Sequence, residues 1–242
     1  GSTGNAGSVI INVRNLISLD YQATIFSTID TGSLGNSVGV QISTDSLRVN
    51  GGAQILSGNQ GSRGTAGNIL IIANDSIILG GIGEDGIPSS IASGLGPNMI
   101  TGQGGNIEIL TPVLELTNGA AIDSSTFGGG TSFTVTKGAV VLSETNGQGD
   151  AGDITIIAQD QVVFDGQAVI SLEEFATDLP DLILPDLYAF TGLEPNSAIL
   201  VGVSSAASFV GPNATGEAGD ITISVLNGSL GVTKGALWGE CS

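Results

Sequence analysis

The 242-residue chain contains no histidine and a single cysteine, Cys241. The absence of histidine excludes a Ser-His-Asp triad, histidine-based acid–base catalysis and metal sites with histidine ligands. One cysteine cannot form an intrachain disulfide, and without a histidine the Cys241 thiol lacks the base that would activate it as a nucleophile. We therefore interpret Cys241 as a free thiol.

Basic residues are also scarce, since five lysines and arginines stand against 23 acidic residues and give a net charge of −18. Nucleic acids and anionic lipids are bound through basic patches, so we expect neither as a partner. The excess of carboxylates favours solubility, and it would allow divalent cations to bridge carboxylates.

Long hydrophobic runs are absent as well. No stretch of 18 apolar residues and no basic, signal-peptide-like N-terminal region occurs, so the sequence predicts no membrane-spanning helix. The opening GNAG at Gly4–Gly7 already belongs to the repeat described below. We therefore expect the 242 residues to be a segment of a longer protein, in which case the missing signal peptide says little about export.

Glycine is abundant, with 39 residues, and it accompanies many Ile, Val, Leu and Ala residues. Hydrophobic residues make up 40% of the chain and aromatic residues only 4%. β-Branched residues interrupted by Gly, Asn, Asp and Ser are typical of short strands and many turns. Few stretches of helical length avoid glycine, so we predict an all-β protein.

Internal repetition is the strongest pattern in the sequence. The hexapeptide AGDITI occurs at Ala151–Ile156 and again at Ala218–Ile223. Looser copies place a glycine before an alternating strand, and these anchor glycines are Gly7, Gly39, Gly67, Gly105, Gly152 and Gly219. The intervals are 32, 28, 38, 47 and 67 residues, and the two longest can hold an extra coil or an insertion.

Each anchor glycine is followed by the same series of elements. An alternating strand such as NILIIA or DITIIA comes first, and a shorter strand such as LRVNG or VVFDG comes second. A corner and a third strand then follow the pattern [DN]-x-x-A-x-I, which begins at Asp20, Asn50 and Asp165. The related copies that begin at Asn118 and Lys137 are interpreted as one residue shorter.

Three short strands and three corners per unit of about 20–30 residues are the signature of a parallel β-helix. One coil cannot bury its inward side chains alone, but coils stacked about 4.8 Å apart pair every strand with its equivalents above and below. We predict a single β-helix domain over residues 1–242, with about six or seven coils. The alternative, a β-sandwich, would require hairpin turns and no fixed corner motif.

Two stretches interrupt the repeat. The corner is expanded at about residues 80–99, and residues 172–197 form a predicted acidic lateral insertion with six acidic residues and no basic ones. The insertion mixes hydrophobic side chains with carboxylates, so it is either a plug that covers apolar surface or a surface for a partner. The partner-binding candidates are Asp181, Leu182, Leu184, Asp186, Leu187, Tyr188 and Phe190.

The expanded corner contains a candidate calcium site. GGIGEDGIP at Gly80–Pro88 fits the pattern G-G-x-G-x-D-x-U-x of calcium-binding repeats, in which glycine turns expose carbonyl oxygens and an aspartate supplies a carboxylate. The candidate ligand is Asp85, in a corner with Gly80, Gly81 and Gly83. Such sites need consecutive copies and this chain has one, so a solvated corner without calcium is the competing interpretation. We predict no other cofactor.

A pair of carboxylates is the remaining route to catalysis, because glycosidases place two carboxylates about 5–10 Å apart across a sugar cleft. Asp153 and Asp220 are equivalent in the two AGDITI copies and form the candidate pair. Other repeats have Ser8, Asn68 and Asn106 at this position, which indicates an interchangeable polar corner residue. We therefore predict that the protein is not an enzyme.

The pattern AGxIxI…LxLxxGAxIxS…G is clearest at residues 149–166 (GDAGDITIIAQDQVVFDG) and 62–81 (SRGTAGNILIIANDSIILGG), and it covers most of the chain outside 172–197. It resembles the repeat region of large bacterial exoproteins of the filamentous-haemagglutinin type, especially the cyanobacterial version. The resemblance implies a right-handed β-helix, two-partner secretion and a role as a surface adhesin or fibrous exoprotein. It implies no catalytic residue, and the family's N-terminal secretion domain with NPNG-type motifs has no counterpart here.

Together these observations predict a structural or adhesive segment of a secreted, cell-surface exoprotein, a rigid β-helical shaft that presents side loops. Its partner would be a component of a cell surface or matrix, either a glycan or a protein. The first alternative is an extracellular fibre subunit, because open β-helix ends are unpaired strand edges that could stack end to end. The second alternative is a polysaccharide-acting β-helix enzyme.

Overall fold

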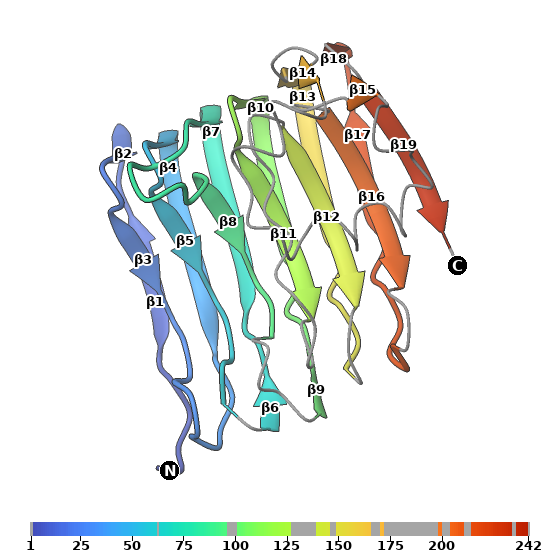
Figure 1. The fold of residues 1–242 in the computed structure, drawn as a ribbon. Helices are drawn as coiled ribbons and strands as arrows, with labels where there is room; N and C mark the ends of the chain where they lie inside the picture. Colours follow the sequence, from blue (N-terminus) through green and yellow to red (C-terminus); the bar gives the residue numbers. More distant parts are fainter. Residues whose placement is uncertain are drawn as a thin grey trace.

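The computed structural model describes residues 2–61, 63–95, 101–126, 139–145, 149–165, 170–171, 198–199, 204–210, 214–233 and 236–241. These residues form strands, turns and bends and no helix, which confirms the predicted all-β class. Figure 1 shows two layers of strands that run in opposite directions, with successive repeats stacked side by side from the N-terminus to the C-terminus.

The first sheet holds the strands that follow the anchor glycines, and all of its neighbouring strands are parallel. Its order is β1 (Ser8–Asn12), β4 (Gly39–Asn50), β7 (Asn68–Gly80), β10 (Ile107–Thr117), β13 (Ile154–Asp165) and β17 (Ile221–Val225). Two short strands complete it, β2 (Leu16–Leu19) beside β4 and β18 (Ser229–Thr233) beside β13.

The second sheet holds the third strand of each repeat, again in parallel. Its order is β3 (Thr24–Phe26), β5 (Gln54–Leu56), β8 (Ser90–Ala92), β11 (Ala121–Thr126), β12 (Val140–Thr145), β16 (Ser204–Val210) and β19 (Ala236–Cys241). A parallel pair, β6 (Arg63–Thr65) and β9 (Thr101–Gln103), lies where the chain returns to the first sheet (Figure 1). Parallel stacking in both sheets is compatible with a β-helix and differs from the hairpins of a β-sandwich.

Alternating Ile, Val and Leu residues form the core between the two sheets. In the first sheet Val40, Ile69, Ile107 and Ile154 occupy one register position and are at most 2% exposed. In the second sheet Ile55, Ile91, Ile122 and Val141 form an equivalent row at 0% exposure. Because the side chains of a strand alternate between two faces, stacking one repeat on the next joins these residues into continuous inner rows.

The register of the first-sheet strands shows that the anchor predicted at Gly39 is wrong by one residue. Gly39 pairs with Ser8 on one side and with Asn68 on the other, so Val38 occupies the anchor position of the second repeat. The first two intervals are therefore 31 and 29 residues. Position 39 requires glycine for a different steric reason. Its φ is +132°, and a Cβ there would lie 2.3 Å from the Asn68 carbonyl oxygen.

The third-strand motif at Asn118 also needs correction. Thr117 pairs with Gly80, which pairs with Asn50, so Thr117 occupies the first position of the motif. The Ala120 N–H donates to the Thr117 carbonyl as the Ala53 N–H does to that of Asn50, at 3.1 Å in both cases. This corner is therefore of full length, and only its first residue departs from [DN].

One repeat supplies two strands to the second sheet. β11 and β12 follow each other along the chain and pair with each other, whereas β10 pairs directly with β13 in the first sheet. The second sheet consequently gains one strand relative to the six stacked anchor strands of the first sheet. This additional strand explains the 47-residue interval between Gly105 and Gly152.

The predicted insertion at residues 172–197 lies outside the described residues. The strands that flank it are β14 (Ile170–Ser171) and β15 (Ala198–Ile199), and they pair antiparallel through Ile170–Ile199 and Ser171–Ala198. The chain therefore leaves and re-enters the stack at neighbouring points. The assignment of residues 1–242 to one domain with this insertion stays a prediction.

Candidate functional site

A row of buried serines is the most regular polar feature of the described residues. Ser124 pairs with Ser143, and Ser143 pairs with Ser208, in the second sheet. Ser27, Ser57 and Ser93 stand at the same position, directly after β3, β5 and β8. Five of the six side chains are at most 4% exposed, and Ser208 is half-buried.

These hydroxyls connect the second sheet to the anchor positions of the first. The Ser124 Oγ donates to the Gly105 carbonyl at 2.9 Å and accepts from the Gly152 N–H at 3.0 Å. The Ser143 Oγ donates to the Gly152 carbonyl at 3.0 Å and accepts from the Gly219 N–H at 2.9 Å. Both hydroxyls thus satisfy backbone groups of two successive repeats, which gives Ser124 and Ser143 a structural role.

Anchor glycines in the interior of the stack are required by the close approach of these backbones. A Cβ on Gly152 would lie 2.3 Å from the Gly105 carbonyl oxygen and 2.7 Å from the Ser124 Oγ. A Cβ on Gly219 would lie 2.3 Å from the Gly152 carbonyl oxygen. No side chain fits at such distances, so the glycine of AGDITI is determined by contact with the preceding repeat.

The candidate carboxylate pair lies within a second ladder, at the start of the first-sheet strands. The Asp220 N–H donates to the Asp153 Oδ1 at 2.9 Å, and the Asp153 N–H donates to the Asn106 Oδ1 at 3.0 Å. The Asn106 N–H donates in the same way to the Asn68 Oδ1 at 2.9 Å. Amide and carboxylate oxygens therefore perform the same task, which gives Asp153 a structural role.

The candidate calcium corner forms a small loop closed by a bridge between Ile82 and Pro88. The exposed Asp85 uses Oδ1 to accept the N–H of Ile87 at 3.0 Å. The proposed carbonyl ligands accept hydrogen bonds as well: Gly80 from the Ser89 Oγ, Gly81 from the Ser89 N–H, and Gly83 from the Gly86 N–H. The loop is therefore held together by its own hydrogen bonds.

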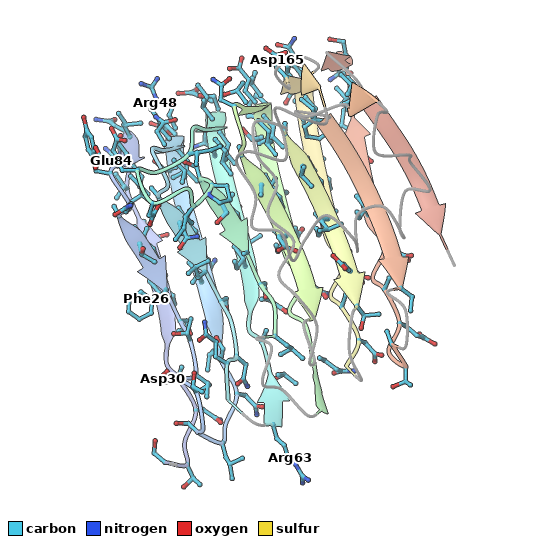
Figure 2. All side chains as sticks on the ribbon, in the orientation of Figure 1. Phe26, Asp30, Arg48, Arg63, Glu84 and Asp165 are labelled. Carbon is cyan, nitrogen blue, oxygen red and sulfur yellow. The ribbon has the colours of Figure 1, made fainter. Side chains whose placement is uncertain are left out.

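The described part of the chain contains no group of three or more His, Cys, Asp or Glu residues that could hold a metal ion. Asp85 stands beside Glu84, which Figure 2 shows at the first-repeat side of the molecule. The calcium assignment stays a prediction.

The predicted partner-binding residues between Asp181 and Phe190 lie outside the described residues, so the structure does not place them. Cys241 lies at the end of β19, where its backbone pairs with Phe209.

Among the described residues, the outer face of each sheet carries a hollow. The larger has a volume of about 390 Å³ and crosses the first three repeats, beside the register shift between β4 and β7. It is lined by residues that include Asn15, Leu16, Asp45, Arg48, Asp75 and Ile78. The smaller, of about 190 Å³, lies on the second sheet between Leu56 of β5 and Leu142 of β12. Neither hollow was predicted, because each forms only where residues of different repeats come side by side.

Charge is distributed unevenly along the stack. Residues 1–63 contain three acidic residues and three basic ones, so their net charge is zero. Residues 64–242 contain the other 20 acidic and two basic residues, which accounts for the whole net charge of −18. The first two repeats, drawn in blue to cyan in Figure 1, therefore form a charge-balanced end of an otherwise acidic molecule.

No helix in the described residues is both long enough and apolar enough to cross a membrane. Comparison of the chain with protein-family models, with curated proteins and with solved structures finds no match.

Proposed function

We propose that the chain is a right-handed parallel β-helix of six coils, with a seventh strand in its second sheet. Parallel strands joined by a crossover connection are right-handed in about 98% of cases, which supports the hand. The serine and Asn/Asp ladders support the stacked coils, because each ladder hydrogen-bonds one repeat to the next.

We propose further that this β-helix is a structural or adhesive segment of a secreted, cell-surface exoprotein. The observation that carries the proposal is the continuous parallel pairing of the first sheet from β1 to β17. A stack in which every strand, core row and polar ladder continues into its neighbour is stiff along its axis, as a shaft must be. The likeness of its repeats to filamentous-haemagglutinin exoproteins supports extracellular export and a cell-surface or matrix partner.

The loops extending from the stack are one surface of this shaft that would meet a partner. The paired strands β14 and β15 support this assignment, because they bring the two ends of the 172–197 segment together beside the coils. A segment attached in this way can vary in sequence without disturbing the ladders.

Negative-stain electron microscopy of the purified chain, with and without millimolar Ca²⁺, tests the proposal. Six coils about 4.8 Å apart stack to only about 30 Å, so we expect separate compact particles in both conditions, together with binding of labelled protein to intact cells or extracellular matrix. Filaments in the absence of calcium would favour the fibre subunit, and protein that binds no cell or matrix preparation would contradict the adhesive role. Binding that appears only with calcium would revive the Asp85 site.

The alternative of an end-to-end fibre subunit is supported by the sheet edges. β1 and β17 end the path of the first sheet, and β3 and β19 end that of the second. Core residues next to these edges, such as Val9, Ile25 and Ile223, are only partly buried. The additional strand argues against simple stacking, because it leaves the second sheet one strand longer at one end. Filaments whose length grows with protein concentration would establish the fibre.

The enzymatic alternative has less support, since Asp153 is engaged in a backbone ladder. We expect no turnover on a panel of polysaccharides; release of reducing ends would overturn this expectation.

A further inference from the structure

The larger hollow lies on the outer face of the first sheet and crosses the two charge-balanced repeats and the third repeat. The register of β4 against β7 shifts there, between Thr44 and Ser46. Residues of three successive repeats line the hollow, so it is a shallow groove that crosses the strands along the stacking direction.

Polar groups repeat along this groove at the spacing of the strands. In the sheet, Leu16 pairs with Ser46, and Ser46 pairs with Ser76. The residues directly before these three are polar: Asn15, Asp45 and Asp75. Neighbouring strands lie about 4.8 Å apart, so an amide and two carboxylates follow one another at about that interval. The Asn74 Nδ2 donates to the Asp45 Oδ1 at 2.9 Å, which fixes the orientation of the central carboxylate.

The groove also offers a cationic donor and apolar contacts. Arg48 is exposed, lies between Ser18 and Ile78 in the register, and points away from the sheet at the strand ends in Figure 2. Leu16 is 54% exposed and Ile78 is half-buried, so aliphatic carbon borders the polar row. Carboxylate acceptors, guanidinium donors and aliphatic contacts together suit a ligand that carries both hydroxyl groups and C–H surfaces.

Charge then narrows the class of ligand. The groove holds Asp45, Asp75 and Arg48, a net charge of −1, and the chain beyond residue 63 is strongly acidic. A polyanion would be repelled on approach, whereas a neutral ligand would meet no such barrier. A polymer whose hydroxyl-bearing units recur at about the strand spacing could bond to one repeat after another.

We propose that this groove binds a neutral polysaccharide chain that lies along the stacking direction, one sugar unit to each repeat. The inference rests on the proposed adhesive function and deepens it by naming a ligand class and a site.

Affinity electrophoresis in native gels tests the proposal, using dextran, hydroxyethyl cellulose and galactomannan as neutral probes and polygalacturonate as the anionic probe. We expect at least one neutral polysaccharide to retard the full chain and the polyanion not to. The variant Arg48→Ala/Asp75→Ala should weaken the retardation at least tenfold in apparent Kd. Its matched control is Arg63→Ala/Asp30→Ala, which makes the same charge change at exposed residues at the opposite end of the strands (Figure 2) and should bind like the original chain.

Three outcomes would overturn the groove assignment: no retardation by any neutral probe, equal loss in both double variants, or retardation by the polyanion alone. Thermal unfolding of both variants shows whether they fold like the parent chain. Failure of this proposal is distinguishable from failure of the adhesive function. If the Arg48→Ala/Asp75→Ala variant still binds cells or matrix as the parent does, the protein remains adhesive and its contact lies elsewhere.

Discussion

The first repeat and the interior repeats share one sequence pattern but have different surroundings. Gly7 and Gly152 are both anchor glycines, yet a Cβ on Gly7 would meet nothing within 4 Å, whereas one on Gly152 would strike the Gly105 carbonyl. Ile11 and Ile71 belong to the same inner row, and only Ile71 is completely buried. The difference shows that the meaning of each repeated residue depends on having a neighbouring repeat on both sides.

This dependence is expected of a stack in which every repeat contacts only its neighbours. Stability is then approximately a sum of contributions from each repeat and from each interface between repeats. The same substitution should therefore cost more in an interior repeat than in the first one, and paired variants measure the contribution of the interface directly.

The largest effect should come from the inner row. Replacing Ile71, which is 0% exposed, by Ala should lower the free energy of unfolding by about 2–5 kcal/mol, because it leaves a cavity that neighbouring strands cannot fill. Ile11→Ala in the first repeat should cost clearly less, since that side chain is partly exposed. Urea denaturation followed by circular dichroism measures both, and equal costs would contradict the interface model.

The anchor glycines should show the next largest contrast. Gly152→Ala should destabilise the protein by about 1–3 kcal/mol, because the added methyl group forces the backbones of two repeats apart. Gly7→Ala adds the same methyl group in open space and should leave the midpoint of denaturation unchanged or slightly raised. A loss of similar size in both variants would indicate that the glycines act through conformational freedom and not through contact.

The serine ladder should give a moderate effect. Ser124→Ala removes the partner of both the Gly105 carbonyl and the Gly152 N–H, and leaving such buried groups unsatisfied costs about 1–3 kcal/mol. Ser208→Ala, near the other end of the stack, removes a donor to the Gly219 carbonyl from a half-buried position and should cost less. Hydrogen exchange measures the effect at the Gly152 amide. This amide should exchange slowly in the parent and in Ser208→Ala and should lose its protection in Ser124→Ala.

The smallest effect should be a gain of stability in the first repeat. Tyr21 and Gln22 have φ values of +51° and +62°, in the corner where an interior repeat has Asn118 and Gly119 at +50° and +89°. Left-handed backbone costs ordinary residues about 1–2 kcal/mol each, so Tyr21→Asn/Gln22→Gly should raise the free energy of unfolding by about 1 kcal/mol. Gly52→Ala in the second repeat should instead lower the free energy of unfolding, since Gly52 has φ +80° and an added Cβ would lie 2.7 Å from the Gly83 Cα. A lower free energy of unfolding in Tyr21→Asn/Gln22→Gly would show that Tyr21 makes a stabilising contact.

Much of the fold could be predicted from the repeats, and the errors have physical causes. Five of the six anchors are correct, and at the interior ones glycine is required because two backbones approach closely. Gly39 was misassigned because it meets a different steric demand one residue later. The serine ladder was overlooked, although its signal, the serine that ends GAxIxS, is visible in the repeats. The groove could not be predicted, since its residues belong to three repeats.

The sequence by itself determined the all-β class, the parallel stacking and the inner rows. The alternation of apolar and polar residues and the repeated corner residues are present within each single repeat. Only the tertiary structure decided the register between repeats and the pairing of β11 with β12, because backbone contacts between distant residues select one alignment among several similar ones. It also decided the distinct surroundings of Gly7 and Gly152, since the residues of one repeat do not specify whether another repeat stacks on it.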